Sequence, residues 1–203
     1  MSVPKPIFAG ARAALEPQRR PGKLRVAALL QAGAEVIAER GYEAATMAEI
    51  AARADAPIGS LYRFFPNKEA LADALVRRYS ELIDATFEKI NTHPATSTTE
   101  EFADALLESL AALRGDSAAV IALLDARPDA SARRSEFHAA FRHNIIRVLK
   151  QRGPHLGDQV EDMAVVLLQN LKMMKSLNPK HDAGAITELR NMTRLYLESK
   201  LGK

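Results

Sequence analysis

The chain has 203 residues, of which 47% are apolar and 26% charged, a balance typical of a globular protein with a sizeable core. It contains no cysteine, which excludes a disulfide framework and thiolate metal sites. We find no apolar run of about 18 residues and no signal-peptide core, so we expect a soluble, cytoplasmic protein without a membrane partner.

The net charge of +3 is concentrated near the start of the chain. Residues 1–66 hold nine Lys or Arg and six Asp or Glu, whereas the remaining residues hold nineteen of each. An excess of positive charge in one segment is typical of a surface that binds phosphate. Residues 1–22 contain four prolines, which forbid a continuous helix, so we predict a flexible basic arm there. A phosphate-binding arm and an idle terminus are both open for this segment.

Residues 23–40 are predicted to form the first helix. Apolar residues recur at helical spacing from Val26 to Ile37, and Gly41 is a natural stop. Gly33 is costly in the middle of a helix, so we expect the helix over residues 58–65 to pack closely against it.

Residues 46–68 read as two short helices joined by a tight turn. Thr46 and Glu49 have the spacing of a capping box at the start of the first helix. Asp55 tolerates left-handed backbone better than most residues, and Pro57 suits the first turn of a new helix. Two small helices across a short turn are typical of a helix-turn-helix, and a plain helical hairpin with solvated polar residues is the alternative.

The second helix, predicted over residues 58–65, has two different faces. Leu61 and Phe65 are four residues apart, so they share one face, which we expect to point inward. Gly59 lets another backbone or a phosphate come close. The outward face presents a hydroxyl, a phenol and a guanidinium group, from Ser60, Tyr62 and Arg63.

Four ordered segments resemble the DNA-binding domain of the tetracycline-repressor (TetR) family of bacterial transcription regulators: Arg40–Tyr42, Thr46–Ala51, Gly59–Tyr62 and Phe65–Leu71. The resemblance runs without gaps from about Val26 to Leu71. There are two departures from the family pattern. Asp55 stands where the family usually has glycine, and Pro57 stands where it often has a capping Ser or Thr.

The resemblance implies that residues 58–65 form a recognition helix that enters the DNA major groove. We expect Arg63 to read a base edge, most naturally N7 and O6 of guanine, and Ile58 to touch a thymine methyl. Ser60 would contact a base or a phosphate, while Tyr62 and Lys68 match family positions that contact phosphate. With Thr46 at a helix start suited to phosphate, the predicted DNA-binding residues are Thr46, Ile58, Gly59, Ser60, Tyr62, Arg63 and Lys68.

The rest of the chain contains helical patterns only. We predict a long helix over residues 68–91 after a cap at Asn67, a break at Gly115–Asp116, and a last helix capped by Asp182. The helices after the long one are predicted over residues 98–113, 117–126, 131–152, 159–176 and 183–201. The expected fold class is therefore all-α with about nine helices. The expected domains are the arm (1–22), a three-helix helix-turn-helix domain (23–70) and, as the resemblance implies, a helical bundle for ligand binding and dimerisation (71–203).

The last two predicted helices carry more apolar surface than a two-layer core needs. Val165, Val166 and Met173 lie around the first of them, outside its main apolar stripe. Surplus apolar surface of this kind suggests a partner. The family habit is a homodimer through a four-helix bundle made from these two helices of each subunit, and we expect the same here.

No catalytic chemistry is evident in the sequence. The five histidines are scattered, and no catalytic, phosphate-loop or dinucleotide motif occurs, so we expect no enzyme activity, no cofactor and no metal site. A helical bundle has room for a ligand cavity, although ordinary core packing explains the same apolar residues. The candidates for lining it are Phe87, Phe102, Phe137, Phe141 and Met163.

The sequence therefore favours a ligand-responsive transcriptional repressor. It would bind a palindromic double-stranded DNA operator as a dimer and be released by a small hydrophobic effector. Two alternatives remain: an activator or constitutive DNA-binding protein without a small-molecule effector, and a helical protein–protein adaptor whose helix-turn-helix is vestigial.

Overall fold

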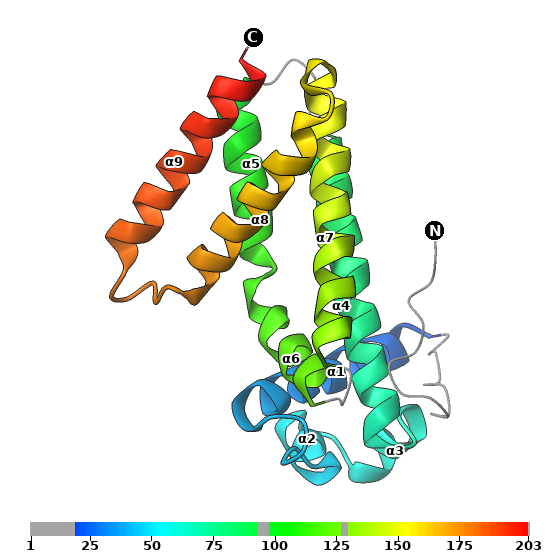
Figure 1. Ribbon diagram of the computed structural model, residues 1–203. Helices are drawn as coiled ribbons and strands as arrows, with labels where there is room; N and C mark the ends of the chain where they lie inside the picture. The colour runs from blue at the N-terminus through cyan, green and yellow to red at the C-terminus, as the bar shows by residue number, and fades with distance from the viewer. Residues whose placement is uncertain (1–18, 93–97, 127–129, 203) are drawn as a thin grey trace. The chain divides into compact units, whose positions relative to one another are not determined.

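The computed structural model describes residues 19–92, 98–126 and 130–202. Within these ranges it contains nine α-helices, one short 3-10 helix and no strand, so the predicted all-α fold class is confirmed (Figure 1). The helices are α1 (Arg20–Arg40), α2 (Met47–Arg53), α3 (Ile58–Phe64), α4 (Lys68–Asn91), α5 (Thr99–Ala112), α6 (Arg114–Asp125), α7 (Ala130–Arg152), η1 (Pro154–Leu156), α8 (Gln159–Ser176) and α9 (Ala183–Leu201). The first 18 residues of the predicted arm lie outside the described residues.

The chain divides into two compact units. Unit 1 comprises the described residues up to Glu81 together with the described parts of residues 115–134, and unit 2 comprises the described parts of residues 82–114 and 135–202. Two of the three dividing points fall inside α4 and α7, so each of these helices contributes one part to each unit, and the third follows the first residue of α6. The domain boundary predicted at residue 70 stays a prediction, because a division by contacts does not test which segment folds alone.

Helix α1 begins three residues earlier than predicted, at Arg20 instead of Lys23. Pro21 lies in its first turn, where the missing N–H of proline removes no helical hydrogen bond. At the other end, Gly41 has a φ of 79° and donates its N–H to the Ile37 carbonyl at 2.8 Å. A positive φ favours glycine, so the predicted helix stop is confirmed.

Gly33, in the middle of α1, marks a close approach of α4. A Cβ atom at this position would lie 3.0 Å from Cδ2 of Leu71, which is fully buried. Close packing was expected here, but the expected partner, the helix over residues 58–65, was wrong. Leu71, on the inward side of α4, fills the space that Gly33 leaves.

The core of unit 2 is formed by large apolar side chains. The Phe87 and Phe141 rings meet edge to face, with centroids 5.2 Å apart, an arrangement that aromatic pairs prefer. Helix α5 begins with a capping box: Thr98 donates its N–H to Oε2 of Glu101 at 2.8 Å, and Glu101 donates its N–H to Oγ1 of Thr98 at 3.1 Å. The fully buried side chains of this unit include Phe87, Leu106, Leu113, Ile145 and Leu149.

Two predicted helix signals in the second half of the chain are wrong. Helix α6 already begins at Arg114, so Gly115 lies in its first turn, where glycine costs less than in a helix interior. The break falls instead at Leu113, whose side chain is buried. Asp182 precedes α9 but makes no cap hydrogen bond to it, because its Oδ2 accepts the N–H of Asn178 at 2.8 Å.

Candidate nucleic-acid interface

Helix α2 is fixed at its start by the predicted capping box. Glu49 donates its N–H to Oγ1 of Thr46 at 3.2 Å, and the Glu49 carboxylate accepts the Thr46 N–H at 3.2 Å and the Thr46 hydroxyl at 2.9 Å. These reciprocal bonds satisfy donors that the first helical turn leaves unpaired. The hydroxyl and the amide of Thr46 are therefore both engaged within the cap, and a phosphate contact by Thr46 stays a prediction.

The turn between α2 and α3 has the predicted left-handed residue. Asp55 has a φ of 46°, and Ala56 donates its N–H to the Ala51 carbonyl at 3.0 Å. Helix α3 starts after Pro57 without a side-chain cap, and its first-turn amide on Ser60 donates to the Pro57 carbonyl at 2.8 Å. Arg25 of α1 donates to the Asp55 carbonyl at 3.3 Å. Both departures from the family pattern, at Asp55 and Pro57, are thus accommodated by the backbone of a tight turn.

Helix α3 separates an inner side from an outer side as predicted. Leu61 is 0% and Phe65 is 1% exposed, so the inward pair is confirmed. On the outer side Tyr62 is 48% exposed and Ile58 is 43% exposed. Ser60 is half-buried, and a Cβ atom added to Gly59 would meet nothing within 4 Å. We call the outward residues Ile58, Gly59, Ser60, Tyr62 and Arg63 the α3 face.

The polar ends of the α3 face are unoccupied. The oxygens of Ser60 and Tyr62 and the guanidinium group of Arg63 make no side-chain hydrogen bond or ion pair with any residue that the structure describes. The Arg63 guanidinium lies 5.9 Å from the centre of the neighbouring Phe64 ring. By contrast, the guanidinium group of Arg40 on α1 is engaged, because it forms an ion pair with the Glu49 carboxylate at 3.0 Å.

Arg53, at the end of α2, is likewise held by α1. Its two terminal nitrogens donate to the Glu39 carboxylate at 2.9 and 2.8 Å, and a Glu35 oxygen lies 3.6 Å away. The hydrogen bonds from Arg53 lower the pKa of the Glu39 carboxyl group. Arg53 therefore ties α2 to α1 and adds no free cation to the α3 face.

Lys68, the last predicted DNA-binding residue, is bound by the loop between α1 and α2. Its ammonium group donates to the backbone carbonyls of Tyr42, Glu43 and Ala45 at 2.9, 3.1 and 3.2 Å. The preceding Asn67 caps α4 as predicted, because its Oδ1 accepts the Ala70 N–H at 2.8 Å. In this arrangement the ammonium group has no N–H left for a phosphate oxygen.

These features together define a helix-turn-helix protein. Helix α2 is capped, a tight turn follows it, and α3 has an apolar inner side and free polar groups on its outer side. Residues 29–75 match the family described as "Bacterial regulatory proteins, tetR family". This segment of the chain, about a quarter of its length, is therefore a TetR-family helix-turn-helix domain.

Individual curated relatives match less than half of the chain. KstR of Mycolicibacterium smegmatis, an HTH-type transcriptional repressor, is 42% identical over 57 residues, which is 28% of this chain and 28% of KstR. DhaR of Mycobacterium sp. (strain GP1), also an HTH-type transcriptional repressor, is 34% identical over 86 residues, which is 40% of this chain and 43% of DhaR. The similarity therefore spans less than half of either relative.

Solved structures match over most of the chain at low identity. A transcriptional regulator of the TerR/AcrR family from Aquifex aeolicus has a TM-score of 0.63 and 20% identity, covering 86% of this chain and 98% of its own. A transcriptional regulator from Saccharomonospora viridis, in complex with choline, has a TM-score of 0.64 and 16% identity, covering 87% and 96%. At this identity the likeness concerns the fold alone.

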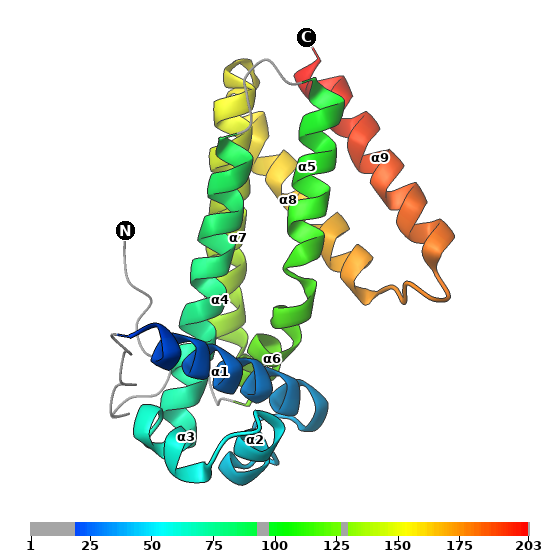
Figure 2. The ribbon, with the colours of Figure 1, turned by 180° about the vertical axis from the view of Figure 1, so that it is seen from behind.

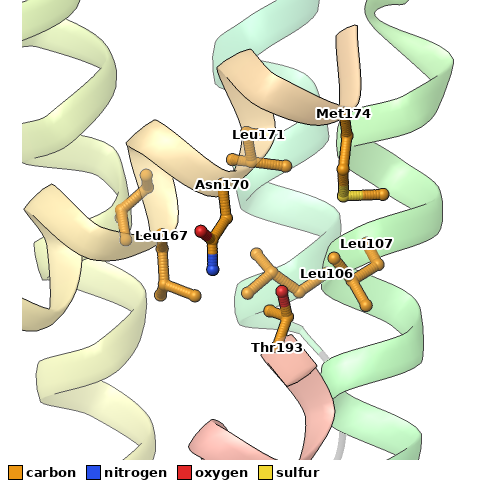
Figure 3. Close-up of a pocket in the computed structure, with 8 residues that line it drawn as sticks. Leu106, Leu107, Leu167, Asn170, Leu171, Met174 and Thr193 are labelled. Atoms are coloured by element: carbon orange, nitrogen blue, oxygen red, sulfur yellow. The ribbon is translucent and has the colours of Figure 1, made fainter. Parts of the chain in front are cut away.

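A small cavity lies within unit 2, between α5, α7, α8 and α9. Its wall is apolar except for Asn170 and Thr193, whose side chains point into the same space (Figure 3). Thr193 donates its hydroxyl to the Leu189 carbonyl at 2.8 Å, whereas the Asn170 amide makes no hydrogen bond with the part of the chain that the structure describes. The apolar lining consists of Leu106, Leu107, Ile145, Leu167, Leu171 and Met174.

None of the five predicted ligand-lining residues lines this cavity. Phe87, Phe102, Phe141 and Met163 are buried in packed core, and Phe137 is half-buried. Their ligand role stays a prediction. Asn170 was missed by the sequence analysis, although a signal exists: it interrupts an otherwise apolar helical stripe, three residues from Leu167 and four from Met174.

Helices α8 and α9 expose large apolar side chains. They are joined by residues 177–182 and run in opposite directions (Figure 2). The exposed apolar side chains are Val165, Val166 and Met173 on α8, as predicted, and Met192 and Leu195 on α9. The last two are 58% and 63% exposed. No helix among the described residues is long and apolar enough to cross a membrane.

Proposed function

We propose that the protein is a transcriptional repressor that binds double-stranded DNA through the α3 face. The observation that carries the proposal is the contrast in unit 1 between engaged and free polar groups. Arg40, Arg53 and Lys68 are held by carboxylates or carbonyls, while Ser60, Tyr62 and Arg63 project unpaired. Leaving strong donors unpaired on a rigid helix is useful when a partner supplies the acceptors, as base edges and phosphates do.

The roles within the α3 face follow from the chemistry of each side chain. Arg63, with its planar fork of donors, reads N7 and O6 of a guanine. Tyr62 donates to a phosphate, Ser60 contacts a base or a phosphate, and Ile58 touches a thymine methyl. Gly59 allows the DNA backbone to come close to α3.

The experiment that tests the proposal is the selection of bound DNA from a random pool by the full chain. The expected result is a palindromic site whose half-sites are about one helical turn apart, or a multiple of it. Failure to enrich any sequence, together with no shift of the DNA flanking the coding region, would exclude this function and favour the adaptor. Binding should also fall steeply with salt, since phosphate contacts release counterions.

Gly59 offers a test that separates folding from DNA binding. Gly59→Ala should leave the free energy of unfolding unchanged or raise it by up to about 1 kcal/mol, because alanine is the better helix former and its Cβ meets no atom. The affinity for the selected site should nevertheless fall about 10-fold, a loss of about 1.4 kcal/mol, if the DNA backbone approaches α3 there. Chemical denaturation and a DNA-binding titration measure the two effects. The matched control is Gly184→Ala on α9, where the added Cβ is equally unobstructed; its DNA affinity should not change.

We further propose that the protein is a homodimer through α8 and α9. The support is the exposed apolar surface on both helices, where five large side chains from Val165 to Leu195 are at least 39% exposed. Met192 and Leu195 are three residues apart and so lie on one side of α9. A two-fold dimer presents two α3 faces related by symmetry, and such a pair matches the two half-sites of the expected palindrome.

The cavity of unit 2 is our candidate for an effector site. Its apolar wall suits a small hydrophobic molecule, and Asn170 with Thr193 supplies one hydrogen-bonding position. The space available to the centre of a water molecule is about 10 Å³, room for about one water. An effector must therefore move side chains on α5, α8 or α9, and it releases DNA only if the moved state binds DNA less well.

Asn170→Leu tests this assignment. Removing an unpaired, partly buried amide should raise the free energy of unfolding by about 1 kcal/mol, measured by chemical denaturation. The same variant should respond less to a metabolite extract that releases the wild-type protein from its operator. A variant that is less stable, or that responds as the wild type does, would show that Asn170 does not face an effector. Thr193→Val, which removes the second polar group, serves as the comparison.

A further inference from the structure

Lys68 stands where a cation is electrostatically unfavourable. It is the first residue of α4, and the helix macrodipole places partial positive charge at that end. A lysine in this position therefore needs compensation from outside its own helix. The resemblance to TetR-family proteins suggested that a DNA phosphate would supply it, but the folded chain already contains the compensating groups.

The compensating groups are three backbone carbonyls in the loop between α1 and α2. The ammonium group donates to Tyr42, Glu43 and Ala45 at 2.9, 3.1 and 3.2 Å, and it lies 4.5 Å from the centre of the Tyr42 ring. A lysine ammonium has three N–H donors, so three bonds use all of them. The Tyr42 ring adds a cation–π contact and is itself buried, which fixes one side of the arrangement.

The loop that Lys68 holds leads directly into the helix-turn-helix. It runs from Gly41, which ends α1, to Thr46, which caps α2. Ala45 is buried and donates its N–H to the Gly41 carbonyl at 3.2 Å, so the loop closes on itself around the ammonium group. Lys68 thus joins the start of α4 to the entrance of α2, with twenty-odd residues of chain, including α3, between the two points.

We propose that Lys68 is a positioning residue for DNA binding: it locks the α1–α2 loop to α4 and thereby fixes the orientation of α2 and α3, and it does not bind a phosphate. The proposal rests on the proposed DNA-binding function. It also gives α4 a direct connection to the helix-turn-helix, since a displacement of Lys68 pulls on the three carbonyls that precede Thr46.

Salt dependence distinguishes a positioning residue from a phosphate contact. Each phosphate neutralised by a cation contributes about −0.9 to the slope of log K against log salt concentration. In Lys68→Met, which keeps the length of the side chain, we expect the affinity for the selected operator to fall about 10-fold at every KCl concentration with an unchanged slope. Hydrogen exchange should become faster at the amides of residues 45–50 in the free protein. The matched control, Lys89→Met, removes an exposed lysine of α4 and should change none of these quantities.

A shallower slope, by about 0.9, with unchanged hydrogen exchange would overturn the proposal and make Lys68 a phosphate contact. A measurement on the wild-type protein covers the case in which Lys68→Met fails to fold. In NMR spectra of the lysine ammonium groups, the Lys68 signal should persist in the free protein and show no nitrogen–phosphorus coupling when the operator is added. A coupling would overturn the proposal. If no DNA is selected from the random pool, the proposed function fails, and the role of Lys68 in DNA binding fails with it. If DNA is selected but Lys68→Met changes the slope of log K against log salt concentration, only the role of Lys68 is overturned.

Discussion

Replacing Arg63 with alanine should weaken binding to the selected operator by about 1–3 kcal/mol, which is about 5- to 150-fold. The guanidinium group is exposed, it has no ion pair among the described residues, and it lies on the same side of α3 as Tyr62. A bidentate contact with guanine is lost completely when the fork is removed, and the neighbouring residues cannot replace it. The free energy of unfolding should stay within about 0.5 kcal/mol of the wild type, because the removed side chain is exposed and makes no hydrogen bond or ion pair with the described residues.

The informative measurement for Arg63→Ala is a repeat of the selection from random DNA. Preference should relax at one position in each half-site and remain at the others. Equal weakening on every sequence would show instead that Arg63 contacts a phosphate. Arg142→Ala, which removes an exposed arginine on α7, is the matched control and should leave both affinity and preference unchanged.

Charging the exposed apolar side of α9 should abolish the dimer. In the double variant Met192→Glu/Leu195→Glu, four like charges would face one another across a two-fold interface, and the apolar area that drives association would be lost. Both side chains are more than half exposed, so the single chain should fold normally. Light scattering at micromolar concentration should report the mass of a monomer instead of a dimer.

The loss of the dimer should also lower operator affinity by about 100-fold or more, because two linked half-site contacts gain 10²–10⁴ in avidity over one. Ile121→Glu on α6, where the isoleucine is 46% exposed, controls for the introduction of a charge and should leave the dimer intact. A wild-type protein that is monomeric at micromolar concentration, or a double variant that stays dimeric, would remove α9 from the interface.

Local sequence signals predicted most of the fold because the chain uses them consistently. The capping box at Thr46, the stop at Gly41 and the inward pair Leu61 and Phe65 depend on contacts within a few residues, and all are confirmed. Sequence signals did not predict contacts between residues that are far apart in the chain. The neighbour of Gly33 is Leu71, 38 residues away, and no local pattern identifies it.

The same distinction applies to the candidate sites. The α3 face could be predicted because the spacing of residues in one short helix shows which share a side, and Ile58, Tyr62 and Arg63 are exposed as expected. The surroundings of Lys68 could not, since they are backbone carbonyls some 25 residues earlier, which have no sequence signature. The cavity of unit 2 arises where four helices meet, so its lining depends on their packing and not on any single helical stripe.

The small volume of that cavity affects how sensitive the protein would be to the proposed effector. With room for about one water, it can hold the proposed effector only after Met174 or its neighbours move, so the proposal implies that the receptive form is a minor population. The concentration needed for half-saturation then equals the intrinsic dissociation constant divided by the fraction of molecules that are open. Substitutions that loosen the packing without touching the proposed effector should lower this concentration, so the sensitivity of the protein would change while its recognition of the effector stays the same.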